Sequence, residues 1–367
     1  MPGSTFGNQF KIMTWGESHG KGIGVVIDGC PAGLTLCEED IQKMLDRRKP
    51  GQSKFSTPRK EEDLVEILSG VFEGRTTGTP IALMVHNKTQ RSGDYHEIAS
   101  YYRPGHADFT FDMKYGFRDY RGGGRSSGRE TVARVAAGAV AGKILEELGV
   151  TVRAYTESIG PVIIDTEKPD FSVMNENPLY MPDMEAARKA SAYLEECMKA
   201  CDSSGGIIAC IVHGLPVGIG ETVFEKLDAR LAHAVMSIGA VKGFEIGDGF
   251  RAAYAKGSEN NDAFRMKDGK PVKKTNHSGG VLGGMSDGSE IFFKAAIKAT
   301  PSIASVQETV NRNGEEIEIS IHGRHDPVIV PRAVVVVESM AAITLLDALL
   351  ENMSSRMDRI RQFYKRD

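Results

Sequence analysis

Two stretches of the chain are apolar around most of a helix, and they constrain the fold more than any other feature. Residues 130–148, ETVARVAAGAVAGKILEEL, are alanine-rich, and Gly149 ends the pattern. Residues 333–357, AVVVVESMAAITLLDALLENMSSRM, form a second long apolar stretch. A helix that is hydrophobic on most sides has to be covered on most sides. The sequence therefore predicts two long apolar helices, of which the first lies buried at the centre.

Shorter elements precede and separate these two helices. Apolar runs that end at glycine or turn residues are typical of strands, and amphipathic runs are typical of helices. Antiparallel-looking strand pairs combined with several buried helices indicate an α+β fold. We expect one large domain over residues 1–367, because no linker or repeat divides the chain. The patterns predict strands at residues 22–29, 63–74, 79–87, 151–160, 205–216, 290–303 and within 315–331, and helices at 36–48, 184–200 and 221–238.

Two polar segments interrupt this pattern, at residues 87–128 and 256–281. The first is long and glycine-rich, and the second is rich in lysine. A loop of such length inside a compact domain is usually functional or disordered. We expect both segments to be mobile, and we expect the basic C-terminal residues 359–367 to be solvated.

Composition and charge exclude several classes of function. The net charge of −4 gives no global basic field of the kind that nucleic-acid-binding proteins usually carry. The five cysteines are an odd number and form no CxxC pair, which indicates reduced thiols in a cytosolic protein. The N-terminus does not resemble a signal peptide, and no run of about 18 apolar residues stands out. We therefore expect a soluble, cytoplasmic protein that does not bind a membrane.

Local groups of basic residues are therefore candidate sites. The stretch RGGGRSSGRET, residues 121–131, places three arginines among glycines and serines just ahead of the first long helix. Ser126, Ser127 and the backbone N–H groups there form a natural phosphate seat at a helix N-terminus. The stretch lacks the spacings GxxxxGK[ST] and GxGxxG, so it is neither a P-loop nor a dinucleotide fingerprint.

A second basic stretch, RRKPGQSKFSTPRK at residues 47–60, is broken by prolines and a glycine, so we interpret it as a loop rather than a solvated helix face. Together with Arg103, Arg121, Arg125, Arg129 and Arg134 it can form a deep cationic pocket. Arginine holds phosphate and carboxylate groups in a forked geometry. The pattern predicts a small ligand with several negative charges, for which two phosphates are one possibility.

Two histidines stand in loops beside this basic set. His19 lies in WGESHGKGIG, next to Ser18, and His106 lies in RPGHADFT. An imidazole titrates near neutrality, so it can give or take a proton. Neither stretch has metal-ligand spacing, and no metal site is predicted. For Asp326, in GRHDP, a reactive cluster and a polar turn are equally good interpretations. The residues alone do not identify the reaction.

Long blocks of the sequence resemble chorismate synthase. They run in order from GNQFKIMTWGESHG to VVVVESMAAITLLDALL and include RPGHADFTFDMKYGFRDYRGGGRSSGRETVARVAAGA and GRHDPVIVPRAV. The resemblance implies a β-α-β sandwich, with a helical core between antiparallel sheets, assembled as a homotetramer. It also implies an anti-1,4-elimination of phosphate from 5-enolpyruvylshikimate 3-phosphate (EPSP), giving chorismate. That reaction depends on reduced FMN and is the last common step of the shikimate pathway to aromatic amino acids.

The resemblance also implies roles for single residues. His19 matches the histidine that protonates the leaving phosphate, and His106 matches the one near N1 of the reduced flavin. Asp326 matches the carboxylate near flavin N5 that assists proton removal, and Ser18 and Ser127 are implied as proton relays. EPSP carries one phosphate and two carboxylates. The residues implied to bind it are Arg48, Lys54, Arg103, Arg129 and Arg134.

Contacts to FMN are implied in the same way, and three positions depart from the family pattern. Lys54 replaces a common arginine, which keeps the charge but loses the fork. Gly239 replaces a common asparagine. Pro301 removes a backbone donor and a hydroxyl group from the expected phosphate-binding segment. The implied FMN contacts are Arg125, Ser126, Ser127, Gly239, Ala240, Gly283, Lys298, Ala299, Thr300, Pro301, Ser302 and Arg324.

Two other functions are compatible with parts of the sequence. A flavin-dependent reductase would also bind FMN but would consume NADPH. The chain shows no clear added module for this, so we expect an external flavin reductant. An RNA-binding protein could use the RGG-like stretch, and a steep salt dependence of RNA affinity would support it. The net charge of −4 and the few exposed-looking aromatic residues argue against nucleic acid as a partner.

Overall fold

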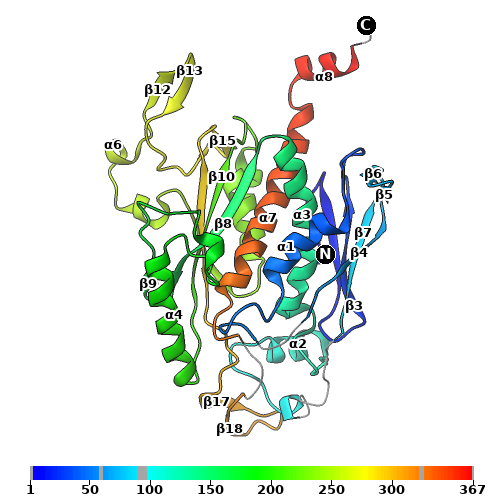
Figure 1. The fold of residues 1–367 in the computed structure, drawn as a ribbon, viewed down its shortest axis with the longest axis vertical. Coiled ribbons are helices and arrows are strands. Elements are labelled where there is room, and N and C mark those ends of the chain that lie inside the picture. The colour runs from blue at the N-terminus through cyan, green and yellow to red at the C-terminus, as the bar shows by residue number, and fades with distance from the viewer. Residues whose placement is uncertain (1–2, 58–60, 89–96, 322–325, 366–367) are drawn as a thin grey trace.

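A computed structural model describes residues 3–57, 61–88, 97–321 and 326–365. Its first sheet is antiparallel, in the order β1-β2-β3-β7-β4 (Figure 1). Strand β3 lies at its centre, and the side chains of Ile23, Val25 and Ile27 are buried because they face the helices. The strands of this sheet are Thr5–Phe6 (β1), Lys11–Gly16 (β2), Gly22–Asp28 (β3), Val65–Ser69 (β4) and Ile81–His86 (β7).

The second sheet is also antiparallel, in the order β11-β16-β10-β8-β9. Its central strands β10 and β16 bury Ile208, Cys210 and Phe293. Such runs of small and β-branched apolar residues suit a sheet that is covered by helices. The strands of this sheet are Thr151–Ile159 (β8), Val162–Ile163 (β9), Gly206–His213 (β10), Val241–Ile246 (β11) and Ile291–Ile297 (β16).

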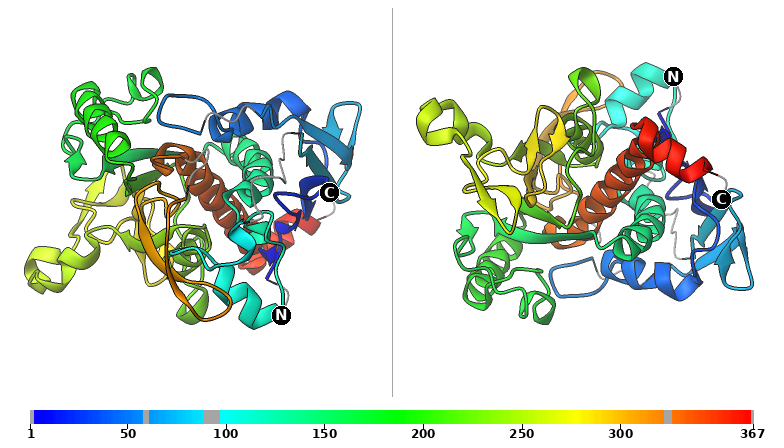
Figure 2. Two further views of the ribbon diagram at one scale, coloured as in Figure 1. Left: turned by 90° about the horizontal axis from the view of Figure 1, so that it is seen from below. Right: turned by 90° about the horizontal axis from the view of Figure 1, so that it is seen from above.

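Helices α1, α3 and α7 fill the space between the two sheets (Figures 1 and 2). Helix α3 packs along α7; α3 contacts strands of both sheets, and α7 contacts β8 and β10 of the second sheet. The expected α+β fold, with a helical core between antiparallel sheets, is confirmed. Helix α5 packs against α7, and α4 lies beside β9. The bounds are Glu38–Arg48 (α1), Thr131–Glu147 (α3), Met184–Lys199 (α4), Leu227–Met236 (α5) and Val330–Glu351 (α7).

Smaller elements decorate the two ends of this core. The β12–β13 hairpin and α8 project from one end, and α2 with the β17–β18 hairpin lies at the other (Figure 1). Short 3-10 turns join several elements, including Gly124–Ser126 (η3) and Gly128–Glu130 (η4) ahead of α3. The small elements are Val71–Phe72 (β5), Arg75–Thr76 (β6), Phe264–Lys267 (β12), Lys270–Lys273 (β13), Val281–Leu282 (β14), Met285–Ser286 (β15), Gln307–Val310 (β17), Glu316–Ile319 (β18), Asp108–Tyr115 (α2), Gly257–Asn260 (α6) and Met357–Tyr364 (α8).

The two polar segments contain more structure than the sequence pattern indicated. Helix α2 lies within 87–128, and the β12–β13 hairpin lies within 256–281. The side chain of Lys273 is only 1% exposed and pairs with Asp262 at 3.1 Å and Asp287 at 2.7 Å. This buried cation ties the hairpin to the turn before β16. The mobility of both segments stays a prediction. The C-terminal tail was expected only to be solvated, but much of it forms the exposed helix α8.

The expected lack of a long apolar run is wrong for the last core helix. In the described part of the chain, Val330–Ser354 is long and apolar enough to cross a membrane by length and composition. In the fold, 78% of its most apolar window is buried inside the protein. The position of α7 between the two sheets accounts for its composition.

A glycine sets the distance between the two central helices. A Cβ atom added at Gly138 of α3 would lie 2.2 Å from the Cβ of Ser339 on α7, well inside contact distance. Gly142, one turn further along the same helix, has open space at the equivalent point. The close approach of α3 and α7 therefore requires glycine at position 138 and not at position 142.

We predict opposite effects for the same substitution at these two glycines. Gly138→Ala forces α3 and α7 apart and lowers the free energy of unfolding by about 1–3 kcal/mol. Gly142→Ala adds helix propensity without a clash, so it leaves stability unchanged or raises it by about 0.5–1 kcal/mol. Urea unfolding of both variants measures the difference. Equal stability of the two variants would contradict the packing argument.

Candidate active site

Two of the predicted basic residues, Arg48 and Arg129, come together where three core helices end. The C-terminal end of α1 meets the N-terminal ends of α3 and α7, at the same end of the molecule as α2 (Figure 1). Arg48 closes α1, Arg129 stands just before α3, and Arg332 lies in the first turn of α7. Side chains that are far apart in the sequence thus come together because the helices that carry them pack as neighbours.

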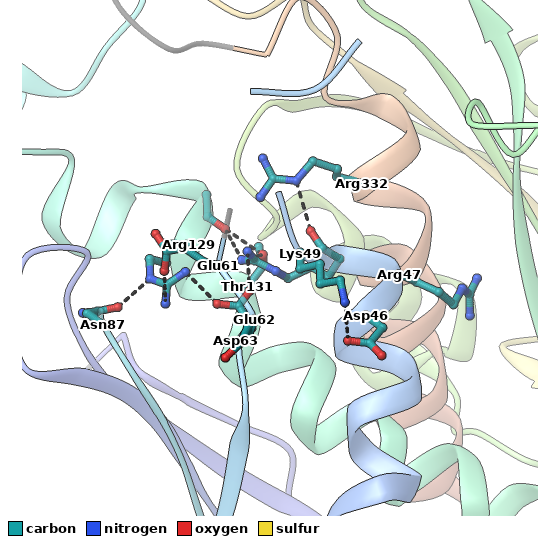
Figure 3. A network of polar contacts seen from close by, with 12 residues as sticks. Asp46, Arg47, Lys49, Glu61, Glu62, Asp63, Asn87, Arg129, Thr131 and Arg332 are labelled. Carbon is teal, nitrogen blue, oxygen red and sulfur yellow. Dashed lines mark hydrogen bonds and ion pairs between the residues drawn. The ribbon is translucent and has the colours of Figure 1, made fainter. Parts of the chain in front are cut away.

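One carboxylate links two of the predicted substrate-binding arginines; Figure 3 shows it, Asp63, beside Arg129. Asp63 accepts from Arg48 Nη2 at 3.1 Å through Oδ2, and from Arg129 Nη1 at 2.9 Å through Oδ1. The Asp63 side chain is 0% exposed, and that of Arg48 is 2% exposed. Arg129 also donates from Nε to Asn87 Oδ1 at 2.5 Å. The pocket therefore contains paired cations rather than a free positive charge.

Burial sets the electrostatics of Arg48. Desolvation lowers the pKa of its guanidinium to about 10, although the charge of Asp63 opposes this. The nearby positive charges of Arg332 and Arg129 lower the pKa further. Arg48 stays protonated at neutral pH. Within the described part of the chain its Nε is buried without a hydrogen-bond partner, so this arginine retains one unsatisfied donor there.

Asp326 lies next to this arginine group and is held from two sides. Its Oδ1 accepts from the Thr57 backbone N–H at 2.7 Å, and its Oδ2 accepts from Arg332 Nη1 at 2.6 Å. Arg332 also donates from Nε to the Arg48 carbonyl oxygen at 3.0 Å, which ties the start of α7 to the end of α1 (Figure 3). The structure therefore places Asp326 in an ordered polar cluster.

The serines ahead of α3 make local bonds, and Arg125 reaches away to the first sheet. Arg125 Nη2 donates to Thr14 Oγ1 at 2.6 Å, and its Nη1 donates to the Gly16 carbonyl oxygen at 3.1 Å. Ser126 Oγ donates to the Gly123 carbonyl oxygen, and Ser127 Oγ caps the next turn by accepting from the Arg129 N–H at 3.3 Å. Arg125 thus fixes the 121–131 loop to β2.

His19 and Ser18 lie against the same loop. Ser18 Oγ is 3.1 Å from His19 Nδ1. A Cβ atom at Gly122 would lie 2.4 Å from that nitrogen, so only glycine allows the loop to approach the ring so closely. Two segments that are about a hundred residues apart in the sequence therefore meet at the predicted acid.

His106 forms a separate group with the segment that follows β16. Its Nδ1 is 2.9 Å from the Pro104 carbonyl oxygen, and its Nε2 is 2.9 Å from Ser302 Oγ. A carbonyl oxygen can only accept, so the neutral ring carries its proton on Nδ1 and accepts from the serine at Nε2. Lys298 Nζ donates to the Gly105 carbonyl oxygen at 3.0 Å and holds the two loops together.

The other residues predicted to bind the substrate lie in different surroundings. Arg103 makes a forked pair with Asp108, at 2.7 and 2.8 Å, and Arg134 bonds Ser237. Lys54 lies on the surface, 64% exposed, and pairs with Glu195.

Gly239 and Ala240 precede β11, where the Ala240 carbonyl oxygen accepts from the Lys298 N–H. Ala299, Thr300 and Pro301 follow Lys298, and Pro301 packs against Gly105. Gly283 lies in the β14–β15 turn, and Arg324 lies outside the described residues.

Sequence reasoning missed the carboxylates and one arginine. Asp63, Glu61 and Arg332 belong to the cluster, but none stood out among the charged residues of the chain. Glu61 Oε2 lies 2.8 Å from Arg129 Nη2. A cavity of about 240 Å³ opens beside Arg332. Its lining includes Arg47 and other residues of the predicted 47–60 loop, but none of the residues implied to bind EPSP or FMN. The one available signal was KEEDLVEI, in which three acids stand just before strand β4.

The arginines, carboxylates and loop histidines of this α+β fold are residue types that enzymes use to bind anions and to move protons. The model of the chorismate synthase family matches residues 10–350. A chorismate synthase of Agathobacter rectalis is 70% identical over 366 residues and all of both chains, and one of Methanocella arvoryzae is 54% identical over 95% of each. A crystal structure of chorismate synthase superposes with a TM-score of 0.78 at 32% identity, covering 98% of this chain and 97% of that one.

The chain therefore belongs to the chorismate synthase family. It is an enzyme, a carbon–oxygen lyase that acts on phosphates, and its family places it in the shikimate pathway.

We predict that His106 is neutral at pH 7. Burial, followed by the positive charge of Arg103, lowers the pKa of its ring below the ordinary value. Because the folded pKa lies below the unfolded one, the group contributes stability at neutral pH that is lost as the pH falls. Imidazole NMR of the folded protein, with His106→Gln to assign the signal, measures the titration. A ring that titrates at or above about 6.5 would contradict this account.

Proposed function

We propose that this chain converts EPSP to chorismate and phosphate by an anti-1,4-elimination that depends on reduced FMN. The observation that carries the proposal is the arginine pocket at the ends of α1, α3 and α7, in which Asp63 holds Arg48 and Arg129 together. A substrate with one phosphate and two carboxylates needs several fixed cations. Guanidinium groups meet that need with paired, directed donors.

Within this proposal the arginines bind the substrate's anionic groups. Arg48 has a buried Nε without a hydrogen-bond partner among the described residues, and we propose that an oxygen of the ligand accepts from it. Arg103 and Arg134 are oriented by their partners Asp108 and Ser237, so each presents its remaining donors in a set direction. Lys54 is exposed, and its flexible side chain reaches the ligand only by leaving Glu195.

Proton transfer falls to the histidines and Asp326. His19, with Ser18 as its neighbour and Ser127 as a second relay, protonates the leaving phosphate. Asp326 assists proton removal near flavin N5, and Thr57 and Arg332 hold both of its oxygens in place for that role. His106 is neutral without ligands, and an anion bound beside it would favour its protonated form. Its role is to stabilise negative charge next to it.

The residues after β16 fit a bound flavin. Thr300 Oγ1 is buried without a hydrogen-bond partner among the described residues. A Cβ atom added at Gly239 would meet no described heavy atom within 4 Å, so there is space beside this glycine. When bound, reduced FMN supplies electron density transiently to the substrate and recovers it as the bond to hydrogen breaks. Residues that would hold it are Arg125, Ser126, Ser127, Gly239, Ala240, Gly283, Lys298, Ala299, Thr300, Pro301, Ser302 and Arg324.

We also propose that the chain works as a single domain in a cytoplasmic homotetramer and takes reduced flavin from an external reductant. The outer face of the first sheet supports association. Met13 is 52% exposed and Trp15 is 37% exposed there, opposite Val26 and Gly24 in the register of β2 and β3. Apolar side chains that share an open sheet face favour burial against another copy.

The direct test is an anaerobic assay with EPSP and chemically reduced FMN, without NADPH. We expect chorismate and phosphate to form together in equal amounts, because the elimination consumes no net reductant. Absorbance and phosphate release follow the two products. A folded chain that binds FMN but forms neither product would remove the proposed function, and a requirement for stoichiometric NADPH would favour a reductase.

The matched control for this assay compares two histidines. His106→Ala removes the charge-stabilising ring, so turnover falls by about 100-fold or more while EPSP still binds. His213→Ala changes a half-exposed histidine at the end of β10, which pairs with Glu290, and leaves turnover unchanged. Similar turnover for the His106→Ala variant and the unsubstituted chain would remove the role assigned to His106.

A further inference from the structure

The buried carboxylate of Asp63 is the centre of the arginine group. It shares one oxygen with each of two guanidinium groups, at 3.1 Å to Arg48 and 2.9 Å to Arg129. Its side chain is fully buried, and its backbone adopts a left-handed conformation with φ of 49°. A non-glycine residue reaches this region at a cost, and such positions persist where the surrounding structure fixes them. Asp63 is therefore held in place from both its backbone and its side chain.

We propose that Asp63 is a positioning residue, which sets the spacing of Arg48 and Arg129 so that together they receive the phosphate or a carboxylate of the substrate. The inference rests on the proposed function, because it takes these two arginines as substrate ligands. It adds a residue to which the family resemblance assigned no role. Asp63 acts through the arginines and does not touch the substrate.

Glu61 makes a different kind of contact with the same arginine. It lies 2.8 Å from Arg129 Nη2, but this nitrogen has no hydrogen-bond partner of good geometry, so the contact is an ion pair alone. The Glu61 side chain is also partly accessible, at 10% exposed. An incoming anion can take the place of Glu61 on Nη2 while Asp63 keeps its hold on Nη1. The two carboxylates thus have separable roles.

A purely electrostatic role and a positioning role predict opposite changes in anion affinity when Asp63 is replaced. If the carboxylate acted only through its charge, removing it would strengthen the binding of an anion nearby. If it fixes the spacing, its loss frees two buried arginines to reorient, and anion binding weakens. For Glu61 both views predict that an anion binds at least as tightly after its charge is removed. The pair therefore provides a variant and a matched control two residues apart.

The test compares Asp63→Asn with Glu61→Gln. Asparagine keeps the volume of aspartate but replaces one acceptor with a donor that faces a guanidinium group. We expect Asp63→Asn to weaken inorganic phosphate binding by about 10-fold or more, measured by calorimetry, and Glu61→Gln to bind it at least as tightly as the unsubstituted chain. With EPSP, Asp63→Asn should raise KM more than it lowers kcat. Phosphate affinity that is unchanged or tighter in Asp63→Asn would overturn the proposal.

Measurements of folding and stability separate a loss of phosphate binding from a loss of structure. Removing one partner of a buried ion pair is strongly destabilising, so near-ultraviolet circular dichroism and urea unfolding accompany each variant. If Asp63→Asn does not fold, the test uses Asp63→Glu instead, because glutamate keeps the charge but displaces it by one methylene. Its phosphate affinity should fall, and an unchanged affinity would overturn the proposal.

The phosphate comparison is also independent of the proposed function. A chain that binds phosphate but does not turn over EPSP fails the proposed function, yet the effect of Asp63→Asn on phosphate still decides the role of Asp63. A chain that binds neither phosphate nor EPSP has no such receptor, which refutes the inference directly.

Discussion

The arrangement of the molecule depends on the burial of α7, which is apolar on most sides. No single sheet can cover such a helix, so it lies between two sheets and against α3, with Gly138 allowing close contact at Ser339. This packing fixes where the helices begin and end. The ends of α1, α3 and α7 consequently meet at one place, and the functional side chains are carried there by elements of the core.

Burial also explains why the pocket contains carboxylates as well as arginines. A guanidinium group with almost no exposure has to be paired, since an isolated buried charge is very costly. Asp63 satisfies this requirement for Arg48 and Arg129, and Asp326 does so for Arg332. The same pairs hold the cations in fixed positions before a ligand arrives. Such preorganisation stabilises developing charge without reorganisation during the reaction.

Local patterns predicted α1, α3 and the strands β3, β7, β8 and β10 closely, because periodic burial is visible in the sequence, but they missed β1, β2 and β11. They also identified Arg48, Arg129 and His106 as members of polar clusters. The partners escaped prediction, since Asp63 lies 15 residues from Arg48 and 66 from Arg129, and only the packing joins them. Helix α2 was missed because glycines surround it, and the surface position of Lys54 depends on a contact with a distant helix.

The central claim is that Arg48 and Arg129, held by Asp63, form the receptor for the substrate's anionic groups. A crystal structure of the chain with EPSP and FMN tests it most directly. The account predicts a phosphate or carboxylate of EPSP within hydrogen-bond distance of both guanidinium groups, with Asp63 still bound to each and Glu61 displaced from Arg129. EPSP bound elsewhere, with Glu61 still on Arg129, would contradict the account.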